Sequence, residues 1–382
     1  MHRRQFGLAT LAGLSTGLTG LTALGIAGVA AAAPDARTLK FGQSASLSGG
    51  QASYGKDVRD GIAAAFAAAN AQAASSGVRF ELQTLDDGGV RSRCLQNVLN
   101  LTESGVAAIV GLTSGAGAEA CLPVIEDAQI ALLGTASGNM GIRSAAAGGA
   151  YHVRAGYDAE YLRMVGYAKD FGLTKVAVVT LADTSPANLQ AMTRALGTLN
   201  VEPKLSLTID RNATSFEAPA NELLAARPDC VLFTANAAPI AKIIDHLHRA
   251  KFPGLFYATS FAGQDLVDTL TARRQSCVMS MVVPRPTAMG VSVVSQCQRD
   301  LSLVPGARMG MTTLEGYIAG RTAVQAALAA QKSGSTSRAR IREALAGLRA
   351  DLGGYRVEFA GTPHGSRYVD LIAVDRYGRL VG

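Results

Sequence analysis

Gly115, Gly117 and Ala120 follow a short apolar run in the segment IVGLTSGAGAEACLPV, which begins at Ile109. Glycines at this spacing after a strand occur in loops that hold the phosphates of dinucleotides. The same turn can hold a small anion, because the first N–H groups of a helix have no partners within it. The next apolar run, IALLGTASG, ends without an acidic residue for a ribose. The turn therefore favours a carboxylate, held by the Ser114 hydroxyl and the Gly115 N–H.

Sequence motifs for covalent or metal chemistry are absent from the rest of the sequence. Beyond residue 33 there is no nucleophile elbow, no His-Glu-x-x-His and no Cys-x-x-Cys. The five histidines show no spacing to a nucleophile, and His246 and His248 would point in different directions on a helix. We expect no enzyme, no cofactor and no metal, and an exported enzyme remains the less favoured alternative.

Alternating strands and helices must position this turn. Strands are expected in the segments TLKFGQSASL, VRFELQTLDD, AAIVGL, IALLGT, KVAVVTL, VEPKLSL, CVLFTA, LFYATS and CVMSMVV. Val58, Ile62 and Phe66 share one helical face, and a long amphipathic helix is expected near 313–330. Two alternating segments at the end of the chain, GGYRVEFAG and RYVDLIAVDRYGRLVG, predict antiparallel strands. The pattern predicts an α/β fold of two doubly wound, Rossmann-like lobes with a hinged cleft.

Ligands of open α/β sheets bind beyond the carboxyl ends of the strands. The turns at those ends are rich in Ser, Thr, Gly and Ala, which let a ligand approach backbone N–H groups and small hydroxyls. These turns are residues 46–54, 112–115, 135–138, 183–185, 234–237 and 260–264.

The overall composition argues against nucleic acid as a partner. The formal net charge is +7, but the basic residues after the leader are scattered. Aromatic residues make up only 5% of the chain and there is no Trp, so a stacking platform for single strands is not expected.

The N-terminal segment has the features of an export signal. Arg3 and Arg4 precede a long, weakly apolar stretch rich in Gly and Thr, and the run Ala30–Ala33 is a suitable cleavage site. The paired arginines are typical of the twin-arginine route. We expect a cleaved signal peptide over residues 1–33 and a periplasmic protein. An uncleaved membrane anchor is the alternative, since the stretch is long enough to span a bilayer.

Five cysteines in an exported chain raise the question of disulfides. Cys94 and Cys121 each lie near the start of a predicted helix, in consecutive β-α units, so we expect a disulfide between them. Cys230 begins a buried strand and is expected to remain a small apolar residue. A bond between Cys277 and Cys297 is the less favoured alternative to two free thiols.

Several ordered segments resemble the type I periplasmic binding proteins, in the branch of leucine/isoleucine/valine-binding proteins that serve ATP-driven importers. The resemblance covers nearly the whole chain after the leader. The matching segments are SLSGGQASYGKDVRDGIAAAF, ESGVAAIVGLTSGAGAEACLPVIEDAQIALLGTASG, YHVRAGYDAEY, YATSFAG, MVVPRP, TTLEGYIAGRTAVQAAL and GGYRVEF with GSRYVDLIAVDRYGRL.

The resemblance implies a three-crossing hinge near residues 155–158, 284–287 and 361–366. Lobe 1 would then comprise residues 34–156 and 285–361, and lobe 2 residues 157–284 and 362–382. It implies delivery of a small molecule to the membrane permease of an ABC importer, by a protein we expect to be a monomer. A protein of the same fold that serves a sensor is the alternative.

The resemblance also implies which residues bind the ligand, and where this chain departs from amino-acid binders. The Ala136 backbone would supply a further donor, and Tyr54 and Tyr157 would form walls, although Tyr157 could instead pack at the hinge. Gly138 stands where relatives have a hydroxyl residue, Asn236 where they have a covering aromatic, and Ser260 where an acid binds the ammonium. Arg154 and Glu160 are either a structural ion pair or ligand contacts. The expected ligand contacts are Tyr54, Ser114, Gly115, Ala136, Ser137, Gly138, Tyr157, Asp183, Asn236 and Ser260.

Overall fold

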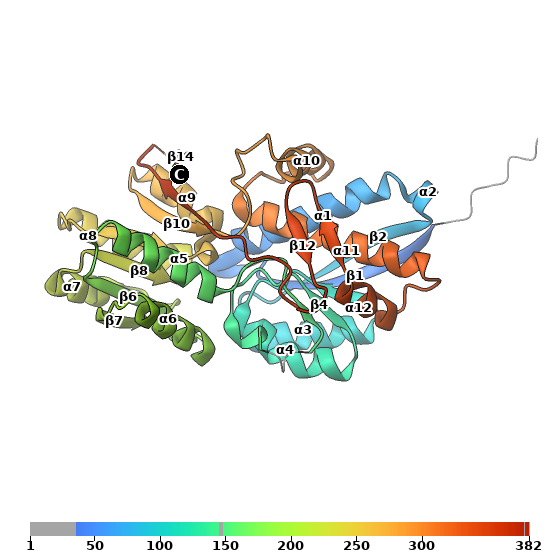
Figure 1. Ribbon diagram of the computed structural model, residues 1–382, viewed down its shortest axis with the longest axis horizontal. Helices are drawn as coiled ribbons and strands as arrows, with labels where there is room; N and C mark the ends of the chain where they lie inside the picture. The colour runs from blue at the N-terminus through green and yellow to red at the C-terminus, as the bar shows by residue number, and fades with distance from the viewer. Residues whose placement is uncertain (1–35, 145–147, 378, 382) are drawn as a thin grey trace, which may run out of the picture. The chain divides into compact units, whose positions relative to one another are not determined.

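The apolar segments of the chain form two largely parallel β-sheets, each flanked by helices (Figure 1). The computed structural model describes residues 36–144, 148–377 and 379–381, which lie in one compact unit. The expected signal peptide, residues 1–33, lies outside the described residues. Each sheet with its helices is a lobe.

Lobe 1 is built on a parallel sheet with the strand order β2-β1-β3-β4-β5. Its strands are β1 (Arg37–Ala45), β2 (Val78–Asp86), β3 (Ala108–Val110), β4 (Ala131–Leu133) and β5 (Ala150–Tyr151). Its helices are α1 (Ala52–Asn70), α2 (Ala73–Ser76), α3 (Arg91–Glu103), α4 (Gly115–Asp127), α10 (Ser292–Asp300), α11 (Met311–Lys332) and α12 (Arg338–Ala346). A short antiparallel pair, β11 (Arg349–Asp351) and β12 (Arg356–Glu358), completes it.

Lobe 2 is built on a sheet with the strand order β14-β13-β10-β9-β8-β6-β7. Its parallel strands are β6 (Val176–Leu181), β7 (Pro203–Ile209), β8 (Cys230–Thr234), β9 (Leu255–Ala258) and β10 (Cys277–Met281). Two antiparallel strands, β13 (Asp370–Val374) and β14 (Leu380–Val381), extend the β10 edge. Its helices are α5 (Tyr157–Asp170), α6 (Pro186–Thr198), α7 (Glu217–Ala226), α8 (Ala237–Arg249) and α9 (Gly263–Ala272).

The predicted face of α1 packs into the core of lobe 1. Val58, Ile62 and Phe66 are all buried there. The helix lies against α11, where Gly61 and Gly316 bring the two backbones together. A Cβ at Gly61 would lie 2.0 Å from the Thr313 carbonyl oxygen, so no side chain fits at this contact.

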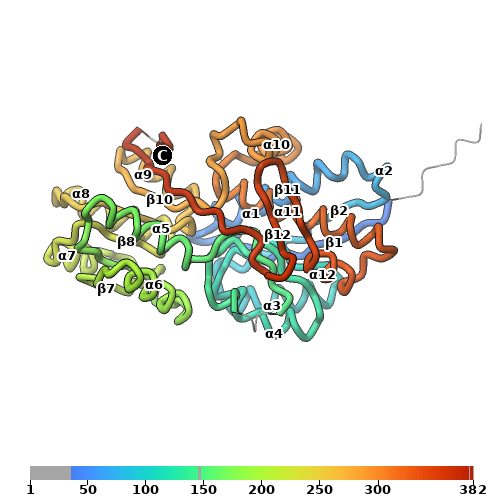
Figure 2. The backbone as a smooth tube through the Cα atoms, in the orientation of Figure 1, coloured from blue at the N-terminus to red at the C-terminus, as the bar shows by residue number. Residues whose placement is uncertain are grey.

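The chain crosses between the lobes three times: between β5 and α5, between β10 and α10, and between β12 and β13. The last crossing can be followed in Figure 2 as the tube that leaves β12 and runs toward the C-terminus. The first and last crossings are paired, since His152 N–H donates to the Pro363 carbonyl at 2.8 Å and Gly365 N–H to the His152 carbonyl at 2.8 Å. The expected boundaries at residues 156, 284 and 361 lie close to these crossings and stay predictions.

Each of the nine segments expected to be strands contains one. The two C-terminal segments do form antiparallel pairs, but in different lobes: β12 pairs with β11, and β13 pairs with β10. The short strands β5 and β11 were not expected, because two or three residues are too few to show a periodicity.

Candidate functional site

Ser114 and Gly115 form the N-terminus of α4, as the sequence predicts. Ser114 caps the helix: its Oγ accepts a hydrogen bond from the Gly117 N–H at 3.0 Å. Its own hydroxyl proton remains able to donate. A Cβ at Gly115 would lie 2.6 Å from Ser137 Oγ, so the turns after β3 and β4 converge here. The helix dipole favours an anion at this point.

A cavity of about 40 Å³ lies where these turns face lobe 2. Its lining includes the expected residues Ser114, Gly115, Ser137, Tyr157 and Asp183. The remaining lining residues are Ala116, Asn139, Leu181, Thr184, Ser185, Asn188, Arg211, Thr234 and Phe261. A volume of this size holds about three waters. A ligand of more than a few heavy atoms must therefore enter while the lobes are farther apart.

Ala136 cannot act as the expected donor. Its N–H donates to the Leu112 carbonyl at 2.8 Å, and its carbonyl accepts from the Tyr54 hydroxyl at 2.6 Å. Both polar groups of the Ala136 backbone are thus used within lobe 1. Tyr54 does not line the cavity but packs edge-on against Phe261, with ring centroids 5.8 Å apart. Burial raises the pKa of Tyr54 well above its usual range, so the hydroxyl keeps its proton.

Gly138 has a packing role in place of a ligand contact. A Cβ at this position would lie 2.4 Å from the Tyr157 ring, so a hydroxyl residue cannot stand here. The Gly138 carbonyl accepts from the Tyr157 N–H at 2.8 Å. Tyr157 itself lines the cavity, and its hydroxyl lies 3.3 Å from Ser137 Oγ. Tyr157 thus packs against the hinge and lines the cavity, and its role as a wall for the ligand stays a prediction.

Ser260 belongs to a buried ion-pair network rather than to the cavity lining. Its Oγ accepts from Arg154 at 2.6 Å, and its N–H donates to Glu160 Oε2 at 2.9 Å. Arg154 also pairs with Glu160 at 2.5 Å and with Glu315 at 3.1 Å. Burial would lower the pKa of Arg154, but the carboxylates of Glu315 and Glu160 raise it above its ordinary value. The ion pair of Arg154 and Glu160 is therefore structural, and it joins the first crossing to both lobes.

Asp183 and Asn236 differ in their surroundings. Asp183 lines the cavity and pairs with Arg211, which also lines it. Asn236 is 6% exposed and lies outside the lining. Among the described residues, neither polar atom of its side chain has a hydrogen-bond partner. The role expected of Asn236 as a ligand contact stays a prediction.

The lining also contains residues that were not expected as ligand contacts, among them Phe261, Asn188 and Arg211. Phe261 follows Ser260 within the turn 260–264, and Asn188 lies in the segment DTSPAN. Arg211 lies two residues beyond the end of β7, a strand end that the selected turns omitted. Because Arg211 follows the carboxyl end of β7, the rule that ligands bind at the carboxyl ends of parallel strands could have identified it. Nothing in the local pattern singles out Asn188.

Two groups of contacts join the lobes. The first lies beside the cavity, where Asn188 Oδ1 accepts from the Met140 N–H at 2.7 Å and the Ser185 hydroxyl donates to Glu119 at 3.3 Å. In the second group, Arg308 of lobe 1 pairs with Asp265 and Asp268 of α9 and with Asp57 of α1. We call this four-residue cluster the clasp. The lobes are therefore in contact in this structure.

Cys94 and Cys121 are buried free thiols, as are the other three cysteines. The two lie in contact: a hydrogen bond with Cys94, together with burial, raises the pKa of Cys121 far above its usual range. The structure contains no disulfide between Cys94 and Cys121, but it places the two thiols in contact. Their disulfide stays a prediction.

No group of three or more His, Cys, Asp and Glu side chains in residues 36–144, 148–377 and 379–381 could hold a metal ion. In the same part of the chain, no helix has the length and apolarity to cross a membrane.

Comparisons with known proteins agree on the fold. The sequence model of one family, described as periplasmic binding protein, matches residues 38–372. A search of curated proteins finds no match. A possible leucine/isoleucine/valine-binding protein from Rhodopirellula baltica SH 1 is 26% identical, with a TM-score of 0.84 over 92% of this chain and 98% of that one.

Two further solved structures hold ligands. A branched-chain amino acid ABC transporter protein from Thermus thermophilus, with bound valine, is 14% identical, with a TM-score of 0.81 over 90% of this chain and 95% of that one. A solute binding protein of an ABC transporter from R. palustris, in complex with 4-hydroxybenzoate, is 17% identical, with a TM-score of 0.76 over 90% and 95%. At these identities the likeness concerns the fold alone. The matches confirm the expected two-lobe α/β fold.

Proposed function

Because the chain belongs to the periplasmic binding protein family, we propose that it captures a small carboxylate between its lobes and delivers it to the membrane permease of an ABC importer. The family consists of substrate-binding proteins, which are generally not enzymes. The observation that carries the proposal is the N-terminus of α4 in the cavity, with Ser114 and Gly115 as donors.

A carboxylate suits the polar groups around this cavity. The Ser114 and Ser137 hydroxyls and the Asn188 side chain surround the helix N-terminus. Hydrogen bonds from neutral donors to a charged acceptor contribute about 1.5–3 kcal/mol each. Phe261 and Tyr157 add aromatic walls for the apolar part of the ligand.

An ammonium group is poorly matched by the same site. Asp183 is the only carboxylate in the lining, and it is paired with Arg211. Glu160 is fully buried and paired with Arg154. A buried charge without a partner costs several kcal/mol. The relative with 4-hydroxybenzoate, a carboxylate without an amine, is the better guide to the ligand than the relative with valine.

Capture proceeds by closure of the hinge. The ligand first meets the fixed donors of lobe 1, and lobe 2 then closes over it and excludes water, which strengthens these hydrogen bonds. Because the cavity is small, the bound state requires that side chains of the lining, such as Phe261, move to fit the ligand. Export through the signal peptide would place the protein in the periplasm, where it acts as a monomer.

The direct test is the identity of the small molecule that co-purifies with the protein. Native protein is isolated from the periplasmic fraction without refolding, and the released small molecules are identified by mass spectrometry. We expect a mature chain that starts near Ala33 and a carboxylate without an amine. Recovery of leucine, isoleucine or valine alone would contradict the ligand class, and intact Met1 in the membrane fraction would contradict the export route.

A further inference from the structure

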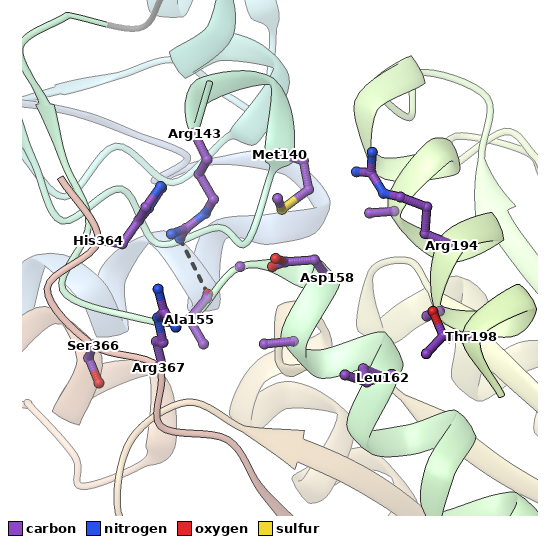
Figure 3. A pocket seen from close by; sticks show the side chains of 14 residues that line it. Met140, Arg143, Ala155, Asp158, Leu162, Arg194, Thr198, His364, Ser366 and Arg367 are labelled. Carbon is purple, nitrogen blue, oxygen red and sulfur yellow. Dashed lines mark hydrogen bonds between the residues drawn. The ribbon is translucent and has the colours of Figure 1, made fainter. Parts of the chain in front are cut away.

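A second and larger cavity lies beside the hinge, outside the ligand site. It has a volume of about 450 Å³ and is shown in Figure 3. We call it the hinge pocket. Its lining comes from the 3-10 turn η2 (Met140–Ile142), the first and last crossings, α5 and α6. The lining residues are Met140, Arg143, Ala155, Gly156, Asp158, Ala159, Leu162, Ala191, Arg194, Ala195, Thr198, His364, Ser366 and Arg367. None of them lines the cavity at α4.

Positive charge dominates the hinge pocket. Arg143, Arg194 and Arg367 face a single acidic residue, Asp158. Burial lowers the pKa of His364, so its ring is largely neutral at pH 7. The charged side chains of the lining thus carry a net excess of two positive charges.

The three arginines differ in availability. Arg143 is buried, and its guanidinium donates to the carbonyl oxygens of Arg154, Ser137 and Ala155 at 3.1–3.4 Å. It holds the first crossing in place and contributes its charge. Arg194 and Arg367 are exposed and have no hydrogen bond or ion pair with any other residue that the structure describes. They are free to bind a ligand.

The positions of these groups limit the shape of a ligand. Figure 3 shows Arg143, His364 and Arg367 gathered on one side of the hinge pocket, and Arg194 with Thr198 on the other side, on α6. Leu162 of α5 lies between the two sides in Figure 3, and the apolar residues Ala159 and Ala191 also line the pocket. A ligand that pairs with both Arg367 and Arg194 must therefore extend from one side of the hinge pocket to the other.

We propose that the hinge pocket binds a small organic dianion whose two acidic groups are separated by a short apolar body. One acidic group pairs with Arg367 and the other with Arg194, while the apolar body covers Leu162 and its neighbours. The two negative charges of the ligand balance the two excess positive charges of the lining. The hinge pocket shares no lining residue with the ligand site at α4.

Such a ligand would couple to the movement of the lobes. Met140 of η2 also lines the hinge pocket, so a ligand that fills it would lie against η2 of lobe 1 as well as α6 of lobe 2 and would stabilise the spacing of these elements seen in this structure. Any change that it makes to the affinity at α4 must be matched by an equal change in its own affinity, because coupling between two binding sites is reciprocal.

Equilibrium dialysis of isophthalate against the full mature protein tests the proposal. Arg194→Gln and Arg367→Gln should each weaken isophthalate binding by about tenfold, which corresponds to about 1.4 kcal/mol. Arg163→Gln is the matched control, since Arg163 is an exposed residue of α5 outside the lining and its removal changes the net charge equally. It should leave binding within about twofold. Benzoate and isophthalate are compared in the Ser114→Asp variant, in which carboxylate binding at α4 is weakened; there benzoate, with one carboxylate, should bind at least about tenfold more weakly than isophthalate.

Three results would overturn the proposal. Equal affinities of the two hinge-pocket variants and Arg163→Gln would show that the pocket is not used. Loss of isophthalate binding in Ser114→Ala, with both hinge-pocket variants unaffected, would assign the dianion to the α4 site and leave the proposed function standing. Equal competition by inorganic phosphate would reduce the site to a general anion site. Because Arg194 and Arg367 are exposed, the variants should fold, which a thermal melt verifies.

Discussion

Ser114 serves two purposes through one hydroxyl group. Its oxygen accepts the Gly117 N–H and so caps α4, while its proton is available to a ligand. Gly115 has a similar double role in the proposed function, because the absence of a side chain lets Ser137 approach and the residue lines the cavity at the helix N-terminus. Under that proposal, structure and binding depend on the same two residues.

Substitution of Ser114 can separate these two purposes. Ser114→Ala should weaken carboxylate binding by about tenfold to a hundredfold, because one hydrogen bond to a charged group is lost. Ser114→Asp retains a capping oxygen but places a negative charge beside the carboxylate, so it should bind even less while the melting temperature stays close to wild type. Titration calorimetry measures the affinities, with Ser302→Ala, an exposed serine of the 3-10 turn Leu301–Leu303, as the control. Unchanged affinity in Ser114→Asp would remove Ser114 from the site.

The residues of the site were only partly predictable from the sequence. Ser114, Gly115 and Ser137 follow from the rule that ligands bind at the carboxyl ends of parallel strands. The role of Gly138 could not be foreseen, because it depends on the Tyr157 ring, 19 positions later in the chain. The donor role expected of Ala136 was wrong, because hydrogen bonds between neighbouring turns are set by tertiary packing.

At the scale of helices and strands, the periodic pattern of apolar residues was sufficient to predict nearly every element. Buried parallel strands are continuous apolar runs, and α1 shows its buried face through residues three and four positions apart. The long helix expected near 313–330 is present as α11, but it is buried on nearly all sides and is not amphipathic. The pairing of β13 with β10 was not predictable, since the alternation of a strand does not identify its neighbour.

A disulfide between α3 and α4 is the prediction at this scale. Cys94 and Cys121 lie in contact within a second apolar cluster of lobe 1, beneath these two helices. A bond in the oxidising periplasm would add about 3.5 kcal/mol to the free energy of unfolding by restricting the unfolded chain. Peptide mapping without reductant should recover the linked peptides. Cys277 and Cys297, which lie in β10 and α10 of different lobes, provide an internal control and should remain free.

Two findings would contradict this prediction. One is a pair of free thiols at Cys94 and Cys121 in protein taken directly from the periplasm. The other is an unfolding free energy that does not change on reduction of a mapped bond.

At the scale of the whole molecule, the clasp and the buried network hold the lobes at different places. Arg154 joins Glu160 of lobe 2 to Glu315 of lobe 1 in the interior. Arg308 joins Asp57 of α1 to the acids of α9 at the surface, where its side chain is 45% exposed. We expect the buried ion pairs of Arg154 to persist when the lobes open, and the exposed ion pairs of the clasp to break.

Removal of the clasp should favour the open arrangement. Arg308→Gln should lower the apparent ligand affinity by about threefold to tenfold, because less of the protein occupies the closed form. Small-angle scattering without ligand should report a larger radius of gyration. Arg299→Gln is the matched control, since Arg299 pairs only with its neighbour Asp300 among the described residues.

Burial raises the pKa of Asp57 to about 6, although Arg308 opposes the shift, so the measurements belong at pH 8, where Asp57 is ionised. Identical scattering of the two variants would show that the clasp does not hold the lobes.

The central claim is that the cleft accepts a carboxylate and lacks a partner for an ammonium group. The most direct test is calorimetric titration of the native protein, freed of co-purified ligand, with leucine and with 4-methylpentanoate, which is leucine without its amino group; amine-free aromatic acids extend the series. The amine-free acids should bind more than a hundredfold tighter than leucine, because the unpaired ammonium would cost about 3 kcal/mol in the closed cleft. Submicromolar binding of leucine, with the amine-free acids inert, would contradict the claim.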